Sequence, residues 1–186
     1  MQRPSSKPHR ERTPAKGERA TKRKTVYETG WKAERTAARF VDARGVWPEM
    51  KAIADTGFLY AFLSSDDLHH HWAVELAGEL SEPAFTCESV LAETAYHLRS
   101  ADAVLELMQA ELIVTMFDFR ANLGHLHELA LRYVDRQPDL ADLCLVRMSE
   151  LFPDRVVLTT DEKDFRVYRR NKRDVIPLVC PPRLRR

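Results

Sequence analysis

Short apolar segments alternate with longer amphipathic segments from Met50 to the end of the chain. The short segments have the length and the β-branched content of buried strands, whereas the longer ones carry apolar residues at helical spacing. Strands that alternate with helices predict βαβ units and therefore an α/β domain with a parallel sheet. The expected strands are residues 51–55, 84–86, 112–117, 156–159 and 175–179. The expected helices are residues 57–63, 69–80, 88–99, 102–110, 120–134 and 138–151.

The chain of 186 residues has two parts of opposite charge. Residues 1–49 hold 13 Lys and Arg against 6 Asp and Glu, whereas residues 50–186 hold 16 against 22. Residues 1–25 are nearly devoid of apolar side chains and cannot bury enough surface to offset the entropy of ordering. We therefore predict a basic, largely disordered extension over residues 1–49, with a short helix at 31–40, and one folded domain over residues 50–186.

Two interpretations of the extension stay open. Its Lys and Arg side chains could contact nucleic acid, because neutralising phosphates releases counterions. Alternatively, Met50 is the natural start of the protein and the extension is a translated upstream stretch. No apolar run approaches the ~20 residues that span a bilayer, and the N-terminus lacks the apolar segment of a secretory signal. The three cysteines (Cys87, Cys144 and Cys180) are widely spaced, which indicates buried thiols in the reduced cytoplasm rather than a zinc site.

Four carboxylates lie within apolar sequence: Asp55, Glu93, Asp142 and Asp161. Asp55 and Asp161 stand at the carboxyl ends of expected strands, and the other two acids lie on expected helices. Burying such charges without a partner costs several kcal/mol. In parallel α/β sheets, sites form beyond the carboxyl ends of the strands, so all four could meet there. A divalent cation could hold them together, and an all-oxygen ligand set selects Mg²⁺ or Mn²⁺.

Four polar residues near these acids have two possible roles each. Thr56 and Thr159 carry hydroxyls that could support the carboxylates or cap the strand ends. Asp139 follows Pro138 at the start of a helix, which favours an N-cap over a metal ligand. Asp164 could cap a short helix at Phe165 or assist the site.

The same residues resemble a known family. Within residues 53–63 a strand ends in Asp55, which is followed by the small hydroxyl residue Thr56, and residues 66–71 form a polar turn before the next helix. Glu93, the stretch 139–142 and the segment 159–165 follow in order at ordinary spacing. This arrangement resembles the PIN domain, and most closely the small VapC-like toxin nucleases. The resemblance covers the body from Met50 to Cys180 and none of the extension.

The resemblance implies a three-layer α/β/α fold with a central parallel sheet of four to five strands. It also implies a metal-dependent endoribonuclease that cleaves single-stranded RNA by water attack at phosphodiesters, as the toxin of a toxin–antitoxin pair. Asp55 and Asp142 are then expected to bind Mg²⁺ or Mn²⁺ directly, Asp161 directly or through water, and Glu93 to position the attacking water. The main alternative is a catalytically inactive PIN-like module that binds RNA or protein, although the presence of all four acids speaks against it.

Other enzyme classes fit less well. Asp55-Thr56-Gly57 resembles the triplet of aspartic proteases, but those enzymes pair two such Asp residues in an all-β fold. An Asp-nucleophile phosphatase would need a second Asp where Gly57 stands. Consecutive residues on a helix point ~100° apart, so the run of three His at 69–71 cannot easily chelate one zinc ion.

Two surfaces are expected to bind partners. A basic cluster follows Asp161 and could contact RNA phosphates, although a solvated surface is the alternative. Two neighbouring helices carry more apolar residues than one sheet face needs, which together with the resemblance suggests a homodimer. The basic cluster consists of Arg166, Arg169, Arg170, Lys172 and Arg173. The apolar residues are Leu91, Tyr96, Leu98, Val104, Leu105 and Met108.

Overall fold

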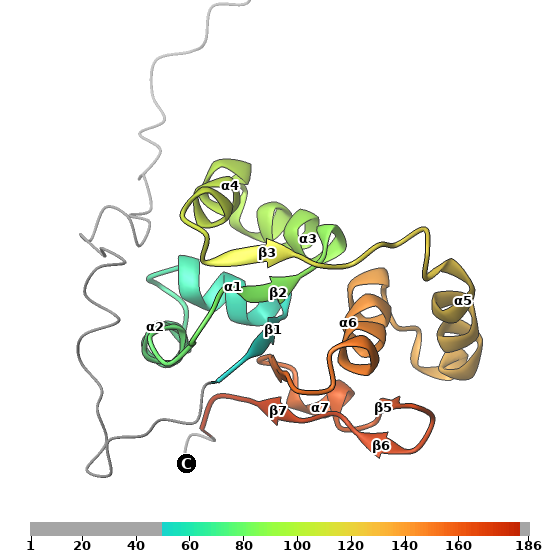
Figure 1. The fold of residues 1–186 in the computed structure, drawn as a ribbon. Coiled ribbons are helices and arrows are strands. Elements are labelled where there is room, and N and C mark those ends of the chain that lie inside the picture. The colour runs from blue at the N-terminus through green and yellow to red at the C-terminus, as the bar shows by residue number, and fades with distance from the viewer. Residues whose placement is uncertain (1–49, 183–186) are drawn as a thin grey trace, which may run out of the picture.

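A computed structural model of the protein has a five-stranded parallel sheet at its centre (Figure 1). The structure describes residues 50–182. The expected extension, including the helix at 31–40, lies outside the described residues. The strand order is β3-β2-β1-β4-β7, and every neighbouring pair is parallel. The strands are β1 (Ala52–Ala54), β2 (Ala84–Thr86), β3 (Ile113–Thr115), β4 (Val156–Leu158) and β7 (Leu178–Val179).

The helices follow the strands as the apolar periodicity predicts. Helix α1 packs against α2 and α3, α3 packs against α4, and α5 packs against α6. Helix α6 also contacts β1 and β4 in the centre of the sheet. These layers confirm the predicted three-layer α/β/α fold. The helices are α1 (Thr56–Leu63), α2 (His70–Ala77), α3 (Glu88–Leu98), α4 (Ala101–Gln109), α5 (Leu123–Arg132), α6 (Leu140–Leu151) and α7 (Glu162–Phe165), with a 3-10 turn η3 at Val134–Arg136.

The core is apolar on both sides of the central strands. All three residues of β1 are fully buried, as are Leu145 and Met148 of α6. Cys87 and Cys144 are buried free thiols, and Cys180 is a half-buried one. No helix within residues 50–182 is both long and apolar enough to cross a bilayer.

The prediction of one strand over residues 175–179 is wrong in one respect, because this segment contributes to two separate short strands. Strand β6 (Asp174–Val175) pairs with β5 (Arg169–Arg170) in an antiparallel hairpin, and only β7 joins the main sheet. The tip residues Asn171 and Lys172 both have positive φ, 51° and 69°, as a tight hairpin requires. Pro177 lacks the N–H that a continuous central strand would need, so the chain breaks there before β7.

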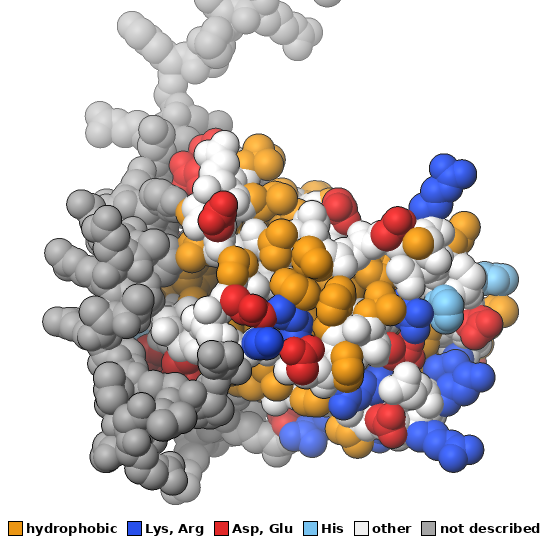
Figure 2. Space-filling model, in the orientation of Figure 1, with side chains coloured by type: hydrophobic (Ala, Val, Ile, Leu, Met, Phe, Trp, Pro, Cys, Tyr) orange, Lys and Arg blue, Asp and Glu red, His pale blue; other side chains and the backbone are white. Residues whose placement is uncertain are grey.

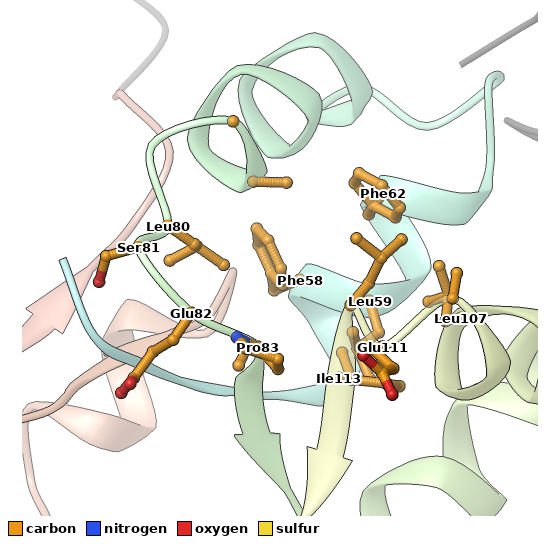
Figure 3. Close-up of a pocket in the computed structure, with 15 residues that line it drawn as sticks. Phe58, Leu59, Phe62, Leu80, Ser81, Glu82, Pro83, Leu107, Glu111 and Ile113 are labelled. Atoms are coloured by element: carbon orange, nitrogen blue, oxygen red, sulfur yellow. The ribbon is translucent and has the colours of Figure 1, made fainter. Parts of the chain in front are cut away.

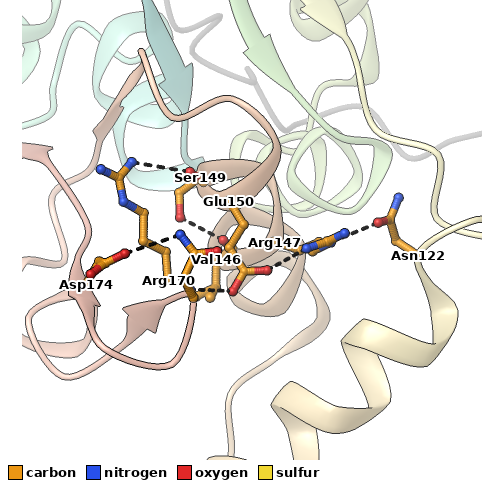
Figure 4. A network of polar contacts seen from close by, with 8 residues as sticks. Asn122, Val146, Arg147, Ser149, Glu150, Arg170 and Asp174 are labelled. Atoms are coloured by element: carbon orange, nitrogen blue, oxygen red, sulfur yellow. Dashed lines mark hydrogen bonds and ion pairs between the residues drawn. The ribbon is translucent and has the colours of Figure 1, made fainter.

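The hairpin is fastened to the end of α6 (Figure 4). The Arg170 guanidinium donates to the carbonyl oxygens of Ser149 and Pro153, at 3.4 and 3.2 Å. The Asn171 N–H donates to Glu150, whose other carboxylate oxygen pairs with Arg147 at 2.7 Å. The segment after Asp161 is therefore held in a fixed place beside α6.

The strand order creates a topological switch point beside β1. From β1 the chain moves outward through β2 to β3, and it then returns to the opposite side of β1 as β4. Connections that leave neighbouring strands in opposite directions open a crevice at the carboxyl ends of those strands. Ala54 pairs with Leu158 at this end, so Asp55 and the residues after Leu158 emerge next to each other.

Candidate active site

Asp55 lies at the junction of β1 and α1 and is 7 % exposed. One carboxylate oxygen accepts a hydrogen bond from the Thr56 N–H, and the other accepts one from the Thr159 hydroxyl, both at 2.6 Å. Burial raises the pKa of Asp55 to about 6, although these two hydrogen bonds oppose the rise. The charged form therefore exists near neutral pH at the expense of stability, unless a cation compensates it.

The segment after β4 brings Asp161 beside Asp55. The Thr159 hydroxyl that donates to Asp55 also accepts from the Asp161 N–H, at 2.9 Å. Close backbone approach reinforces this link, because a Cβ at Gly57 would lie 2.1 Å from Thr160 Oγ1. The two hydroxyls expected to support the acids are thus hydrogen-bonded to them, Thr159 to Asp55 and Thr56 to Glu93.

Asp161 also caps the short helix α7. Its side chain accepts from the Asp164 N–H at 3.0 Å. The expectation that Asp164 caps this helix is wrong, because the helix begins at Glu162 and Asp164 supplies the N–H rather than the acceptor. Asp164 nevertheless lines the same cavity as Asp161.

Helix α6 presents Asp142 from its first turn. Asp139 is the N-cap, as predicted, and accepts from the Asp142 N–H at 2.8 Å. The Tyr168 hydroxyl donates to Asp142 at 3.1 Å. Burial, followed by the charge of Asp139, raises the pKa of Asp142 to about 7, and the Tyr168 hydrogen bond opposes this. Burial and the neighbouring Asp142 in turn raise the pKa of Tyr168.

Glu93 reaches the site from the middle of α3. Its Oε2 accepts from the Thr56 hydroxyl at 2.8 Å, and its Oε1 lies 3.6 Å from His97 Nε2. Thr56 is also the residue whose N–H binds Asp55. One threonine therefore fixes the orientation of two of the four acids.

All four predicted acids line one cavity of about 560 Å³. Thr56, Asp139 and Asp164 line it too, whereas Thr159 is fully buried behind Asp55. Sequence reasoning missed several lining residues that come from turns and helix ends. Only the polar turn at 66–71, which holds Asp67 and His69, gave a signal for any of them. The missed residues are Tyr60, Asp67, His69, His97, Arg136, Gln137, Thr160 and Tyr168.

The basic cluster lies outside this cavity, and three of its members have partners within the protein. Arg169 donates to the carbonyl oxygens of Arg166, Val167 and Tyr168, and Arg170 binds the end of α6. The exposed Arg166 pairs with Glu162. Figure 2 shows Lys and Arg side chains gathered around the β5–β6 hairpin and the adjacent end of α5.

The three consecutive histidines face different partners, as their helical positions predict. His70 Nδ1 contacts the Ala61 carbonyl oxygen at 2.8 Å, and His71 lies 3.3 Å from Glu75. His69 packs against Trp72 and lines the acidic cavity.

The donor set suits a hydrated divalent cation. Within residues 50–182, no three His, Cys, Asp or Glu side chains lie close enough to bind one ion directly. Mg²⁺ usually keeps several waters and takes only one or two protein carboxylates, so a roomy cavity with separated oxygen donors fits this ion. The raised pKa values of Asp55 and Asp142 add an electrostatic demand for positive charge.

A second cavity, of about 400 Å³, lies at the opposite, amino ends of the strands. Phe58, Leu59 and Phe62 of α1 face it, together with Leu107 and Ile113 (Figure 3). Its two carboxylates are Glu82, which pairs with Arg155, and Glu111. This apolar cavity lacks the converging polar groups that chemistry requires.

A parallel α/β domain with carboxylates gathered at its switch point is the class of protein that this fold and site define. The family model of the PIN domain matches residues 52–171, which span four of the five sheet strands (β1 to β4), the four acids and the β5 strand, and the protein belongs to this family. PIN domains are generally nucleases and typically use divalent metal ions. A comparison with curated proteins gives no match.

Proposed function

We propose that the protein is a metal-dependent endoribonuclease that cleaves single-stranded RNA by water attack at phosphodiester bonds, with Mg²⁺ or Mn²⁺. The observation that carries the proposal is the convergence of Asp55, Glu93, Asp142 and Asp161 on one cavity at the switch point. Two of these acids have raised pKa values, which is typical of functional sites. The described lining of the cavity includes no Ser or Cys nucleophile.

Each acid has a role that follows from its contacts. Asp55 and Asp142 would hold the metal ion, and Asp161 would hold it directly or through water. When bound, the ion would supply Lewis-acid activation of water and offset negative charge on the phosphate. Thr56 positions Glu93 through Oε2. Oε1, which lies 3.6 Å from His97 Nε2, is the oxygen that would orient a water and accept its proton. Thr159 and Tyr168 hold Asp55 and Asp142 in place.

The wider function follows the small VapC-like toxins that the sequence resembles. We propose a cognate antitoxin as protein partner and a homodimer formed through α3 and α4. Tyr96 on α3 is 78 % exposed and Leu105 on α4 is 54 % exposed, whereas Val104 belongs to the core. In the basic cluster, the exposed Arg166, Lys172 and Arg173 are the members best placed to contact RNA phosphates.

The decisive experiment is cleavage of a single-stranded RNA by the purified full-length protein. Cleavage should require Mg²⁺ or Mn²⁺ and should stop with EDTA. Asp142→Asn should remove it, whereas the matched control Asp102→Asn on the exposed face of α4 should not. Cleavage that persists with chelator would refute the metal-dependent mechanism. RNA binding without cleavage under any metal would support the inactive-module alternative.

The toxin role needs a separate test, because a ribonuclease need not be a toxin. Induced expression in a bacterial host should arrest growth, and Asp142→Asn should abolish the arrest at equal protein level. Unimpaired growth with active enzyme present would remove the toxin proposal and leave the ribonuclease proposal standing.

A further inference from the structure

Arg136 is the only Lys or Arg side chain among the described residues that line the acidic cavity. Seven carboxylates share this lining: Asp55, Asp67, Glu93, Asp139, Asp142, Asp161 and Asp164. A polyanionic substrate must approach this field of negative charge, and one or two bound cations offset only part of it. The positive charge of Arg136 in the cavity lining therefore lies where it can offset the repulsion between the acids and an RNA phosphate.

The guanidinium of Arg136 has no structural role within residues 50–182. No carboxylate in this range pairs with it and no acceptor takes a hydrogen bond from it, and the residue is exposed. Other arginines nearby are engaged: Arg147 binds Glu150 and Asn122, and Arg170 binds carbonyl oxygens. Arg136 is thus available for a ligand from solution.

The backbone of Arg136 is nevertheless held firmly. It ends the turn η3, where its N–H donates to the Tyr133 carbonyl oxygen at 2.8 Å. The next residue, Gln137, has φ 51° and ψ 50°, a conformation that non-glycine residues rarely adopt. Such local strain persists where the surrounding structure enforces it and often marks a functional position. The turn therefore holds the backbone of Arg136 in a fixed position, while its guanidinium lines the cavity without a partner among residues 50–182.

The same turn is tied to the acid on α6. The Tyr133 ring packs against the Tyr168 ring with centroids 5.0 Å apart, and Tyr168 donates to Asp142. The Tyr133 hydroxyl also accepts from the Arg169 N–H at 2.9 Å. Arg136 and Asp142 are consequently placed relative to each other by shared aromatic contacts and not by a mobile loop.

We propose that Arg136 binds a backbone phosphate of the RNA strand next to the bond that is cleaved, and so sets the register of the strand over the acids. The inference rests on the proposed ribonuclease function. Guanidinium and phosphate form paired, charge-assisted hydrogen bonds that an ammonium group cannot reproduce. The contact adds affinity and position without base selectivity.

The test compares full-length Arg136→Ala, Arg136→Lys and the control Arg132→Ala. Arg132 is exposed one turn earlier on α5 and does not line the cavity. Binding of a fluorescent single-stranded RNA is measured by anisotropy in EDTA, so that no cleavage occurs. Arg136→Ala should weaken binding about tenfold, and its log Kd should depend less steeply on log salt, by about 0.7. Arg136→Lys should keep the salt dependence but recover only part of the affinity. Arg132→Ala should stay within about twofold of the parent.

Kinetics with Mg²⁺ provide the second readout. Arg136→Ala should raise KM about as much as Kd, with kcat within about twofold, because the contact is made before and during the reaction. Unchanged RNA binding in Arg136→Ala would overturn the inference. Tighter Mn²⁺ binding in the same variant would then show that Arg136 acts as a counter-ion of the acids. Absence of cleavage in the parent refutes the proposed function alone, since the binding experiment in EDTA still decides on Arg136. Absence in the parent of both RNA cleavage with Mg²⁺ and RNA binding overturns both proposals.

Discussion

Replacing Asp55 by Asn should abolish cleavage and at the same time stabilise the metal-free protein. The side chain is 7 % exposed, and its carboxylate is fixed by Thr56 and Thr159. Asn has nearly the same shape, and its oxygen can still accept from the Thr56 N–H. The amide, however, is a poor metal ligand and carries no charge to offset a cation. Activity is therefore lost for a chemical reason and not through unfolding.

The expected gain in stability follows from the raised pKa. A rise from 3.8 to about 6 corresponds to a destabilisation of about 3 kcal/mol by the charged form. Because the folded pKa is raised, this penalty is absent below the unfolded value near pH 4, grows as the pH rises, and is complete above pH 6. Burial of the amide reduces the gain, so Asp55→Asn should be about 2 kcal/mol more stable at pH 7.5 and nearly equal to the parent at pH 4.

Urea unfolding in EDTA at pH 4, 5, 6 and 7.5 measures this difference. Addition of Mg²⁺ should narrow the difference in unfolding free energy between the variant and the parent. At a Mg²⁺ concentration a hundredfold above its Kd, binding stabilises the parent by about 2.7 kcal/mol, whereas the variant lacks the site. Asp102→Asn, an exposed acid on α4, controls for the removal of one negative charge. A gain that is the same at pH 4 and pH 7.5, or a variant that keeps substantial activity, would show that Asp55 is not a strained metal ligand.

Three further predictions test other parts of the structure. Asp142→Asn should be inactive, whereas Asp139→Asn should retain most activity, because Asn still caps α6; RNA cleavage assays would contradict this if both were equally dead. A chain that starts at Met50 should fold and keep kcat, since the first described contacts of the sheet are those of Met50 with Ser81. Circular dichroism measures its folding and sedimentation its solubility. An unfolded or insoluble protein would mean that the domain needs the preceding residues, and the apolar cavity of Figure 3 is a place where they could bind. Light scattering should show a dimer that a Tyr96→Glu substitution on the exposed part of α3 dissociates, and a parent monomer of about 21.5 kDa at all concentrations would exclude it.

Much of the fold could be predicted because its signals are local. Each strand of the main sheet is a short apolar run bounded by turn residues, and the expected segment 84–86 coincides with β2. The helix start at Asp139 followed from a capping preference that acts within four residues. The hairpin β5–β6 escaped prediction because its register depends on positive φ at Asn171 and Lys172, and neither residue is a glycine.

The four acids of the site were predictable from the sequence, most directly the two at strand ends. Asp55 and Asp161 follow buried strands, so their meeting follows from parallel topology. Tyr168 and Arg136 approach the cavity through tertiary packing of Tyr133 against Tyr168, and no periodicity in the sequence reports that contact. The structural use of Arg169 for backbone carbonyls was likewise hidden, because charge patterning cannot distinguish a free arginine from an engaged one.

The hydrogen bonds around Asp55 also explain how the site can exist without metal. Thr159 and the Thr56 N–H both donate to the carboxylate, and such donors favour the charged form over the protonated one. Burial acts in the opposite direction and dominates. As a result, the protein orients the Asp55 carboxylate before a metal ion binds, but no positively charged side chain within residues 50–182 neutralises its charge. A stronger protein partner, such as an arginine at Thr159, would remove the penalty and with it the driving force for cation binding. The residual destabilisation of Asp55 is thus the free energy of folding that is lost to keep the site receptive to a cation, and the close packing of Gly57 against Thr160 holds Asp161 beside Asp55.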